Sequence, residues 1–350
     1  MKSVLLGMSG GVDSSVSAIL LKEAGYKVVG LTMCLFGNGS CCNMQSILDA
    51  KAVCKKLGIE HYTLDFQKEF KENVIDKFIE EYQNCRTPNP CIDCNRYLKF
   101  GAMYEFAKEH NIDYIATGHY AKVVYSEEYK RYVITKSKAD KKDQTYVLYN
   151  IPQELVEHIV FPLGDFESKD QIREIAREHG MLVASKPDSQ EICFVPDNDY
   201  VNFLEKHNIQ GMRHGRIVNT KGEILGKHQG LHRYTIGQRR GMGISSSTPL
   251  YVLKLNKENN TLVVGKEEEL YTDTVCVSEP NSLLWDKFED GLEVDAKIRY
   301  SAPAKPAVIH VNEDGTLTVK FKEKVRAVTP GQAIAFYVGN ILAGGGKIEG

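Results

Sequence analysis

The sequence lacks the features of secreted, membrane-spanning or uniformly cationic proteins. Its first apolar run, Val4 to Leu6, ends at Gly7 and is too short for a signal peptide or a membrane span. We therefore expect a cytoplasmic protein that does not cross a membrane. The formal net charge of -2 excludes a uniformly basic surface, so any polyanion must be bound by local patches. The chain also lacks internal repeats and low-complexity tracts.

What is present describes an ordinary globular protein of more than one domain. With 350 residues, the chain exceeds the size at which a single hydrophobic core is common, so two or three domains are expected. Hydrophobic residues make up 42% and charged residues 26% of the chain. Nine cysteines without a secretion signal favour reactive thiols or metal ligation over a disulfide scaffold.

The segment Ser9–Ser15, SGGVDSS, lies between an apolar run and a helical pattern. Its paired glycines allow positive φ angles, so successive N–H groups could bind an anion at a helix N-terminus. We expect Gly11 to need such a conformation, which a β-branched residue resists. The motif lacks the lysine of the Walker sequence, so it is not the usual cradle for β and γ phosphates. The alternative is a glycine-rich turn that only joins a strand to a helix.

Apolar runs and helical patterns alternate after this segment. Strands are expected at 3–7, 27–33, 61–66 and 114–117, and helices at 16–25, 45–57, 70–83 and 97–110. This alternation predicts a parallel sheet with crossover helices. Ligands bind at the carboxyl ends of such strands, where SGGVDSS, Met33 and the Thr117–Tyr120 turn would all lie.

The pattern changes along the second half of the chain. Segments 122–125 and 131–135 predict a hairpin, and Ser168 with Gln171 has the spacing of a capping box before a helix at 169–178. From about Arg216, short alternating segments are separated by turn signals, which predicts two small all-β modules.

Three cysteines stand in distinctive contexts. Cys91 and Cys94 form a CxxC motif after two prolines, which favour a stiff, extended approach, and Cys193 lies in SQEICF. By itself the CxxC motif fits a redox pair, half of a metal site, a catalytic thiol near a helix N-terminus, or a chance pair. Cys34, Cys54 and Cys276 lie in apolar runs and are expected to be small core residues.

A basic stretch occurs in the β-rich half. Between Lys227 and Lys257 there are six Lys or Arg residues and no Asp or Glu. Such a patch could contact phosphates, or it could be a solvated basic face.

Two family resemblances follow from these motifs. SGGVDSS resembles the loop of the PP-loop ATP pyrophosphatases, which binds the pyrophosphate that leaves when an acceptor is adenylated. In addition, SGGVDSS, TPNPCIDCN, ATGHYAK, KDQTYVLY, FPLG and SQEICF occur in the order found in bacterial and mitochondrial tRNA-specific 2-thiouridylases. This second resemblance covers nearly the whole chain and implies ATP-dependent 2-thiolation of the wobble uridine (U34).

The resemblance also implies a fold and a set of partners. The fold is α/β, with a PP-loop catalytic domain at 1–200 that has a parallel sheet of the adenine nucleotide alpha hydrolase type. A β-rich central tRNA-binding domain at 201–272 and a C-terminal β-barrel domain at 273–350 follow. The implied cofactors are ATP and Mg²⁺, with Asp13 as a candidate metal contact. The implied partners are tRNA, through its anticodon stem-loop, and a desulfurase or sulfur-relay protein that donates sulfur.

Carried over residue by residue, the resemblance names a site. The ATP site falls on Gly7, Met8, Ser9, Gly10, Gly11, Val12, Asp13, Ser14, Met33 and Gly118. The nucleophilic cysteine falls on Cys94, and the cysteine that carries sulfur as a persulfide falls on Cys193. Contacts to the target base fall on Asn89, Pro90 and Cys91. Wider tRNA contacts fall on His119, Lys142, Asp143, Gln144, Arg299, Tyr300 and Gln332.

One departure from the family leaves two sulfur mechanisms open. Many members have an aspartate where this chain has Cys91, which removes the natural candidate for proton handling beside the catalytic thiol. Cys91, Cys94 and Cys193 together could instead ligate three irons of a [4Fe-4S] cluster and leave the fourth iron open to sulfide. The resemblance favours the persulfide. Another PP-loop adenylating ligase, or a tRNA-binding protein without catalysis, are the rival functions.

Overall fold

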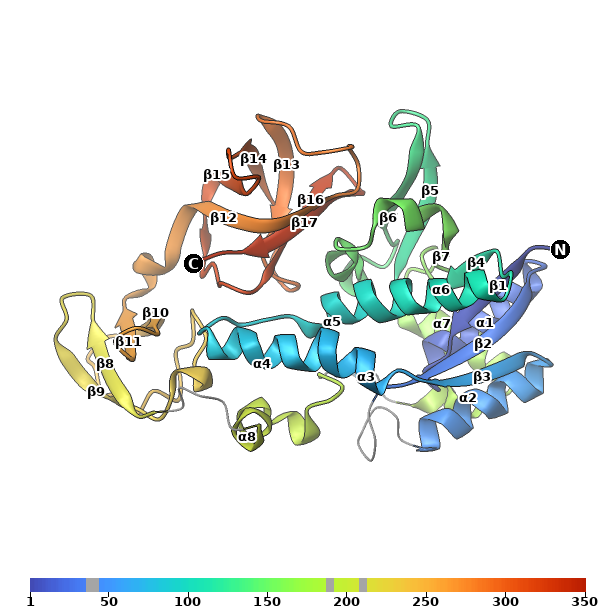
Figure 1. Ribbon diagram of the computed structural model, residues 1–350, viewed down its shortest axis with the longest axis horizontal. Coiled ribbons are helices and arrows are strands. Elements are labelled where there is room, and N and C mark those ends of the chain that lie inside the picture. The colour runs from blue at the N-terminus through green and yellow to red at the C-terminus, as the bar shows by residue number, and fades with distance from the viewer. Residues whose placement is uncertain (36–43, 187–191, 208–212) are drawn as a thin grey trace.

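The computed structural model describes residues 1–35, 44–186, 192–207 and 213–350. An α/β part, here residues 1–207, precedes two β parts (Figure 1). Its sheet has five parallel strands in the order β3-β2-β1-β4-β7. The strands are β1 (Ser3–Gly7), β2 (Lys27–Cys34), β3 (Glu60–Asp65), β4 (Tyr114–Ala116) and β7 (Ile159–Val160). The predicted parallel sheet is confirmed, and β7 is an additional edge strand.

Successive residues of β1 supply two cores, one on each face of the sheet. Val4 and Leu6 pack with α1 (Val12–Glu23), α2 (Met44–Leu57) and α7 (Lys169–Glu178). Leu5 packs on the other face with Phe100 and with α6 (Met103–Glu109). The capping box predicted for Ser168 and Gln171 is present. In the part of the chain that the structure describes, no helix combines the length and apolar character needed to cross a membrane.

Two of the predicted helices contain a π-helical segment, and both begin earlier than the sequence predicts. The helix expected at 70–83 consists of α3 (Gln67–Phe70), η1 (Lys71–Ile75) and α4 (Asp76–Gln83). The helix expected at 97–110 consists of α5 (Pro90–Asp93), η2 (Cys94–Ala102) and α6. The second begins at Pro90 because proline is favoured at the first helical position, and the Asn89 side chain caps it by accepting from Cys91 N.

The two predicted all-β modules are present. The central sheet has the order β10-β11-β8-β9, and the barrel has the order β12-β15-β14-β13-β16-β17, closed by pairing of β12 with β17. The central strands are β8 (Gly215–Asn219), β9 (Ile224–His228), β10 (Tyr251–Asn256) and β11 (Thr261–Gly265). The barrel strands are β12 (Tyr271–Ser282), β13 (Leu292–Lys297), β14 (Lys305–Val311), β15 (Leu317–Arg326), β16 (Ala333–Val338) and β17 (Ile341–Ile348).

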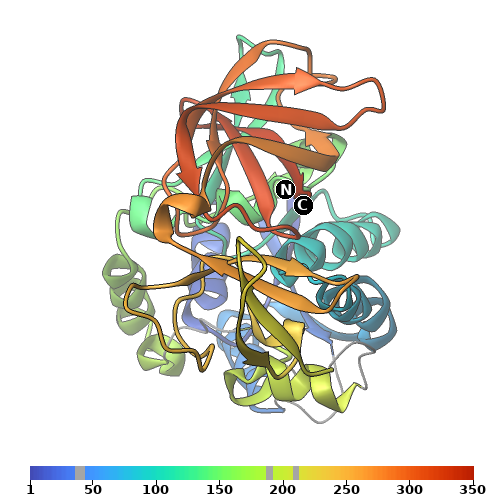
Figure 2. The same ribbon diagram turned by 90° about the vertical axis from the view of Figure 1, so that its left-hand side faces the viewer.

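The predicted hairpin, β5 (Ala121–Ser126) and β6 (Arg131–Lys136), joins the α/β part to the barrel. Thr135 of β6 pairs with Ile341 of β17, and the hairpin lies beside the barrel in Figure 1. Ala335, Tyr337 and Leu342 of the barrel belong to the same core as Leu5 and Phe100. Figure 2, seen from the side of the central sheet, shows the barrel above the α/β part.

The chain also contains a further α-helix and several short 3₁₀ segments. These are α8 (Tyr200–Lys206) and the 3₁₀ segments Asp140–Lys142, Thr145–Leu148, Gln153–His158, Leu182–Ser185, Pro196–Asn198, Leu231–Arg233 and Glu267–Leu270.

Candidate functional site

The SGGVDSS loop lies between the end of β1 and the start of α1. Gly10 has φ +69°, and a Cβ on it would overlap the Ser46 carbonyl oxygen and lie 3.0 Å from Ser46 Cα. The Ser14 hydroxyl accepts from the Ser9 N–H at 3.2 Å, and the Ser15 hydroxyl donates to the Gly11 carbonyl at 2.8 Å. These bonds hold the loop at the N-terminus of α1, where backbone N–H groups favour an anion.

The expectation that Gly11 needs a positive φ is wrong. Gly11 caps α1 in an extended conformation, with φ -99° and ψ 171°. Within the described part of the chain, a Cβ on Gly11 would meet only the Ser9 hydroxyl, at 3.3 Å. The left-handed residue of the pair is Gly10, whose conformation glycine adopts without the Cβ penalty.

Two lysines from distant segments reach this loop. Lys169 Nζ lies 2.5 Å from Asp13 Oδ2, and the Tyr120 hydroxyl donates to Asp13 Oδ1 at 2.9 Å. Lys186 Nζ donates to the Gly10 carbonyl at 3.1 Å and to Asp49 at 2.6 Å, and its hydrogen bond lowers the pKa of the Asp49 carboxyl. No local spacing in the sequence points to either lysine. The loop has no Walker lysine, and Lys169 and Lys186 together place positive charge beside it.

Asp13 supplies a carboxylate in the loop at the start of α1. Among the described residues, no three His, Cys, Asp or Glu side chains gather to hold a metal ion. One carboxylate fits Mg²⁺, which commonly binds through one or two carboxylates, phosphate oxygens and water. Asp13 would therefore hold such an ion jointly with a bound phosphate, and its Lys169 pairing would have to rearrange.

The remaining residues expected at the ATP site also lie at the carboxyl edge of the sheet. Gly118 follows β4, and a Cβ there would lie 3.0 Å from Asp13 Cβ and 3.1 Å from Ser14 N. Met33 lies near the end of β2 and is partly buried. The structure thus brings the expected residues 7–14, Met33 and Gly118 to one edge.

Cys94 and Cys193 pack in one apolar cluster. Cys94 is 7% exposed and packs with Phe70, Leu98 and Phe194, while Cys193 and Met33 lie at the margin of the same cluster. Burial raises the pKa of the Cys94 thiol to about 12, with smaller contributions of the same sign from Cys193 and Cys91. The nearby Lys99 charge acts in the opposite direction. The two expected catalytic cysteines are therefore neighbours, and both lie near Met33 at the end of β2.

Lys99 is a functional candidate that sequence reasoning missed. Cys94 begins the π-helical segment, whose i to i+5 hydrogen bonding brings residue 99 back beside residue 94. Lys99 opposes the burial that raises the pKa of the Cys91 thiol, and it adds to the burial that holds the pKa of His119 well below its ordinary value. The charge of Lys99 therefore acts on both cysteines of the CxxC motif and on His119. An α-helix starting at Tyr97 would not predict this arrangement.

Cys91 completes the cysteine group. It keeps solvent-exposed surface at the helix N-terminus, while the protein around it raises the pKa of its thiol through desolvation. Cys193 adds to this rise in the pKa of Cys91, and both Cys193 and Cys91 add to the rise in the pKa of Cys94, so the three thiols lie in one group.

Several residues that the resemblance assigns to tRNA make internal contacts in this structure. His119 is 8% exposed, and its ring shares a hydrogen bond of 2.7 Å with the Thr117 hydroxyl. Asp143 accepts from Ser137 N and from the Thr145 hydroxyl, and the Gln144 side chain accepts from Tyr120 N at 2.9 Å. Lys142, beside them, is partly buried. Gln144 therefore fixes the backbone of Tyr120, whose hydroxyl donates to Asp13 of α1.

Arg299, Tyr300 and Gln332 come from the barrel. Arg299 donates to the Ile236 carbonyl at 3.1 Å and to the Ala327 carbonyl at 2.8 Å, so it ties the barrel to the segment before the central sheet strand β10. Gln332 donates to the Thr87 carbonyl at 2.7 Å. Tyr300 is 45% exposed with Lys297 Nζ 5.5 Å from its ring centre, which leaves an aromatic surface for an unstacked base.

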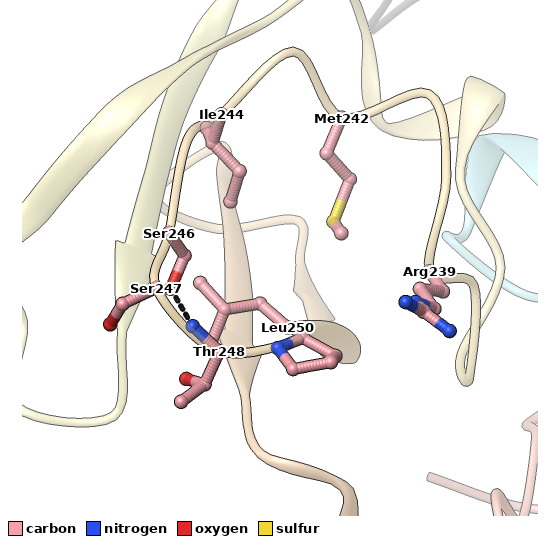
Figure 3. Close-up of a pocket in the computed structure, with 8 residues that line it drawn as sticks. Arg239, Met242, Ile244, Ser246, Ser247, Thr248 and Leu250 are labelled. Atoms are coloured by element: carbon pink, nitrogen blue, oxygen red, sulfur yellow. Dashed lines mark hydrogen bonds between the residues drawn. The ribbon is translucent and has the colours of Figure 1, made fainter.

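The middle of the basic stretch, residues 239–250, lines a pocket of about 360 Å³. Arg239 lies on one side and the Ser246–Thr248 turn on the other, with Met242, Ile244 and Leu250 between them (Figure 3). Arg239 and Arg240 are exposed, whereas Arg233 is paired with Glu205 and Lys257 donates to Asn84. Fewer than the six cations of this stretch are therefore available to bind a polyanion. Arg239 and Arg240 are two exposed cations that could do so.

Two of the other expectations for cysteines can also be compared with the structure. Cys54 is 1% exposed, as expected for a core residue. Cys276 is exposed, because alternation along β12 points Val275 and Val277 inward and residue 276 outward.

Comparisons with known proteins match the whole chain. Three family models match in sequence: a tRNA methyl transferase HUP domain at 2–197, a tRNA methyl transferase PRC-barrel domain at 201–266 and an aminomethyltransferase beta-barrel domain at 272–348. The tRNA-specific 2-thiouridylase MnmA of Clostridioides difficile is 50% identical over 99% of this chain and 98% of its own. The corresponding protein of Acetivibrio thermocellus is 49% identical over 99% of both chains.

A solved structure is similar at a much lower level. The U34-tRNA thiolase NcsA from Methanococcus maripaludis, with its [4Fe-4S] cluster, matches with TM-score 0.37 and 17% identity over 59% of this chain and 64% of that chain. A match at this level carries no conclusion about the cofactor here. The family models and the full-length relatives, in contrast, agree from end to end, and the chain belongs to the tRNA-specific 2-thiouridylase family.

Proposed function

We propose that this protein is an ATP-dependent tRNA-uridine 2-sulfurtransferase that converts the wobble uridine, U34, to 2-thiouridine. The observation that carries the proposal is the 50% identity to a named 2-thiouridylase over 99% of the chain. The geometry supports it, because a phosphate-binding loop and a pair of neighbouring cysteines lie at the same side of the sheet. Such a tRNA-modifying enzyme would work in the cytoplasm.

ATP is needed because the uridine C2 carbonyl has no leaving group. In the first step, O2 attacks the α-phosphorus of ATP, pyrophosphate departs, and AMP on O2 becomes the leaving group. The N-terminus of α1, Lys169 and Lys186 would stabilise the charge of the departing pyrophosphate. Mg²⁺ held between Asp13 and phosphate oxygens would supply further positive charge.

The sulfur step uses the cysteine pair. The terminal sulfur of a persulfide on Cys193 attacks C2 and AMP departs, which leaves the base joined to Cys193 through a disulfide. The Cys94 thiolate then attacks the Cys193 sulfur, releases 2-thiouridine and forms a Cys94–Cys193 disulfide. A desulfurase or sulfur-relay protein renews the persulfide after a thiol reductant has reduced this disulfide. Lys99 favours the Cys94 thiolate against the effect of burial.

Different parts of the chain carry out the chemistry and bind the RNA. We assign both chemical steps to residues 1–200, and RNA binding to the segments 201–272 and 273–350. Cations Arg239 and Arg240 and the exposed ring of Tyr300 are the surface groups suited to phosphates and an unstacked base. Because the target atom lies on a base of the anticodon loop, that base must leave its stack to reach Cys193.

The test is tRNA-dependent pyrophosphate release together with nucleoside analysis of the product. Release of pyrophosphate that requires tRNA and yields 2-thiouridine supports the proposal. Adenylation of a small molecule without tRNA would support a different PP-loop ligase, and binding of tRNA without pyrophosphate release would support a non-catalytic RNA-binding protein.

A further inference from the structure

The segment that leads into the cysteine helix is held by the barrel. Thr87 N donates to the Pro330 carbonyl at 2.8 Å, and Gln332 Nε2 donates to the Thr87 carbonyl at 2.7 Å. Both backbone polar groups of Thr87 are therefore bonded to one barrel turn. Thr87 lies two residues before the helix cap Asn89 and seven before Cys94, so its position fixes where this helix begins.

The barrel turn approaches this segment as closely as a glycine allows. Gly331 has φ +87°, and a Cβ on it would lie 2.9 Å from Arg86 Cβ, from Glu81 Oε2 and from Thr87 N. A side chain at position 331 would push the turn away from Thr87 and break its two hydrogen bonds. The contact thus depends on a left-handed glycine that has no space for a Cβ.

A charge network reinforces the same junction. Arg86 Nε lies 3.0 Å from Glu81 of α4, and Arg86 Nη2 lies 2.7 Å from Glu349, just after β17. Lys347 Nζ lies 2.6 Å from Glu81. The Arg86 side chain is 21% exposed and that of Glu81 13%, so these charges are largely removed from solvent and each depends on its partners. Figure 1 shows the C-terminus beside the barrel and near α4.

The segment before the central strand β10 meets the junction too. The Thr87 hydroxyl donates to the Thr235 hydroxyl at 3.4 Å, and Arg299 bonds the neighbouring Ile236 carbonyl to the barrel. Both RNA-binding parts of the proposed enzyme therefore contact the chain at the entrance to the cysteine helix.

We propose that Gln332 and Arg86 are positioning residues, which fix the cysteine helix against the barrel so that Cys94 meets the base only when the barrel is docked on Thr87. The inference rests on the proposed function. It differs from the family resemblance, which makes Gln332 a tRNA contact, because here the side-chain amide is bonded to protein. It predicts that the junction controls sulfur transfer, whereas adenylation at the SGGVDSS loop, to which the hydrogen bonds between Thr87 and the barrel turn do not extend, proceeds without it.

The variant that tests this is Gln332→Met, which keeps the side-chain length and removes the donor to Thr87. Three quantities are measured with full-length protein and tRNA: the dissociation constant for tRNA, pyrophosphate release and 2-thiouridine formation. We expect 2-thiouridine formation to fall by about 10- to 100-fold, because a misplacement of about 1 Å can cost 10²-fold. Pyrophosphate release and tRNA affinity should stay within about threefold, so the ratio of pyrophosphate to 2-thiouridine rises at least about threefold.

Two further variants keep the proposal falsifiable. Glu349→Gln weakens one arm of the Arg86 network and should raise the same ratio by a smaller factor. Lys320→Gln changes an exposed residue of the barrel strand β15, away from the junction, and should leave the ratio unchanged. The rate at which a mild oxidant forms the Cys94–Cys193 disulfide should fall in Gln332→Met, which a change in tRNA contact would not cause.

The measurements on Gln332→Met distinguish a positioning role from an RNA contact and from a merely structural role. A weaker tRNA affinity with an unchanged ratio in Gln332→Met would show that Gln332 contacts RNA and would overturn the inference. Equal loss of pyrophosphate and 2-thiouridine together with a lower melting temperature would show a merely structural role and would also overturn it. Absence of 2-thiouridine from the parent protein would instead refute the proposed function itself.

Discussion

Gly10→Ala perturbs the loop at its most constrained residue, and Gly11→Ala is its matched control. An alanine at Gly10 must adopt φ +69°, which costs roughly 1–2 kcal/mol, and its Cβ overlaps the Ser46 carbonyl oxygen of α2. At about 2–4 °C per kcal/mol for a domain of 150–250 residues, the melting temperature should fall by about 2–8 °C. Relief of the overlap must also move α2 or the loop by about 1 Å, which should lower pyrophosphate release about 100-fold.

Gly11→Ala should behave differently because Gly11 is extended and, among the residues that the structure describes, its Cβ would meet only the Ser9 hydroxyl. Its melting temperature should stay within about 1–2 °C of the parent, since a surface change without strain alters stability by about 0.5 kcal/mol or less. Scanning calorimetry and tRNA-dependent pyrophosphate release measure both variants. An unchanged melting temperature and unchanged release for Gly10→Ala would refute the loop geometry described here.

Three other predictions concern the thiols and the RNA surface. Lys99→Met removes the charge that opposes the burial of Cys94, so the pKa of that thiol rises further, alkylation of Cys94 at pH 8 slows by about tenfold, and the rate profile of sulfur transfer shifts to higher pH. Arg239→Gln with Arg240→Gln should weaken tRNA binding and reduce the slope of log affinity against log salt by about 1.5, since each phosphate contact contributes about 0.7–0.9. Cys91→Ser should retain substantial 2-thiolation without bound iron, whereas Cys94→Ser should be inactive.

Each of these has a contrary outcome. An unchanged alkylation rate in Lys99→Met would remove the electrostatic role of that lysine, and Lys99→Arg should restore the parent rate. Equal salt slopes in parent and double variant would place both arginines outside the RNA surface. Loss of iron together with activity in Cys91→Ser, and recovery on cluster reconstitution, would establish the [4Fe-4S] mechanism in place of the persulfide.

The sheet was predictable because β1 and β2 are apolar, buried runs and because strand-like and helical segments alternate along this part of the chain. Strand β7 was not, since two residues carry no detectable pattern. The early start of the cysteine helix was missed because Pro90 was interpreted as part of an extended approach, although proline also suits a first helical position. The outward position of Cys276, in contrast, follows from the alternation around Val275 and Val277 and could have been predicted.

Some residues of the candidate site could likewise be predicted from the sequence and others could not. The loop, Met33 and Gly118 were predictable because parallel strands end at one edge of their sheet. Lys169 lies 156 residues from Asp13, and Lys186 lies 176 residues from Gly10, so no local pattern connects them. Lys99 faces Cys94 only because the helix is π-helical there, and residue types do not distinguish that spacing from an ordinary helix.

The most direct test of the central claim is a reconstituted thiolation reaction with the purified full chain. The reaction contains unmodified tRNA with U34, ATP, Mg²⁺, a sulfur-donating desulfurase with cysteine and a thiol reductant. Mass spectrometry of the digested tRNA and quantification of AMP and pyrophosphate follow product formation. The account predicts 2-thiouridine at position 34 with one AMP and one pyrophosphate for each sulfur transferred, and no product from Cys193→Ser. Sulfur incorporation without AMP formation, or AMP formation without any 2-thiouridine, would contradict it.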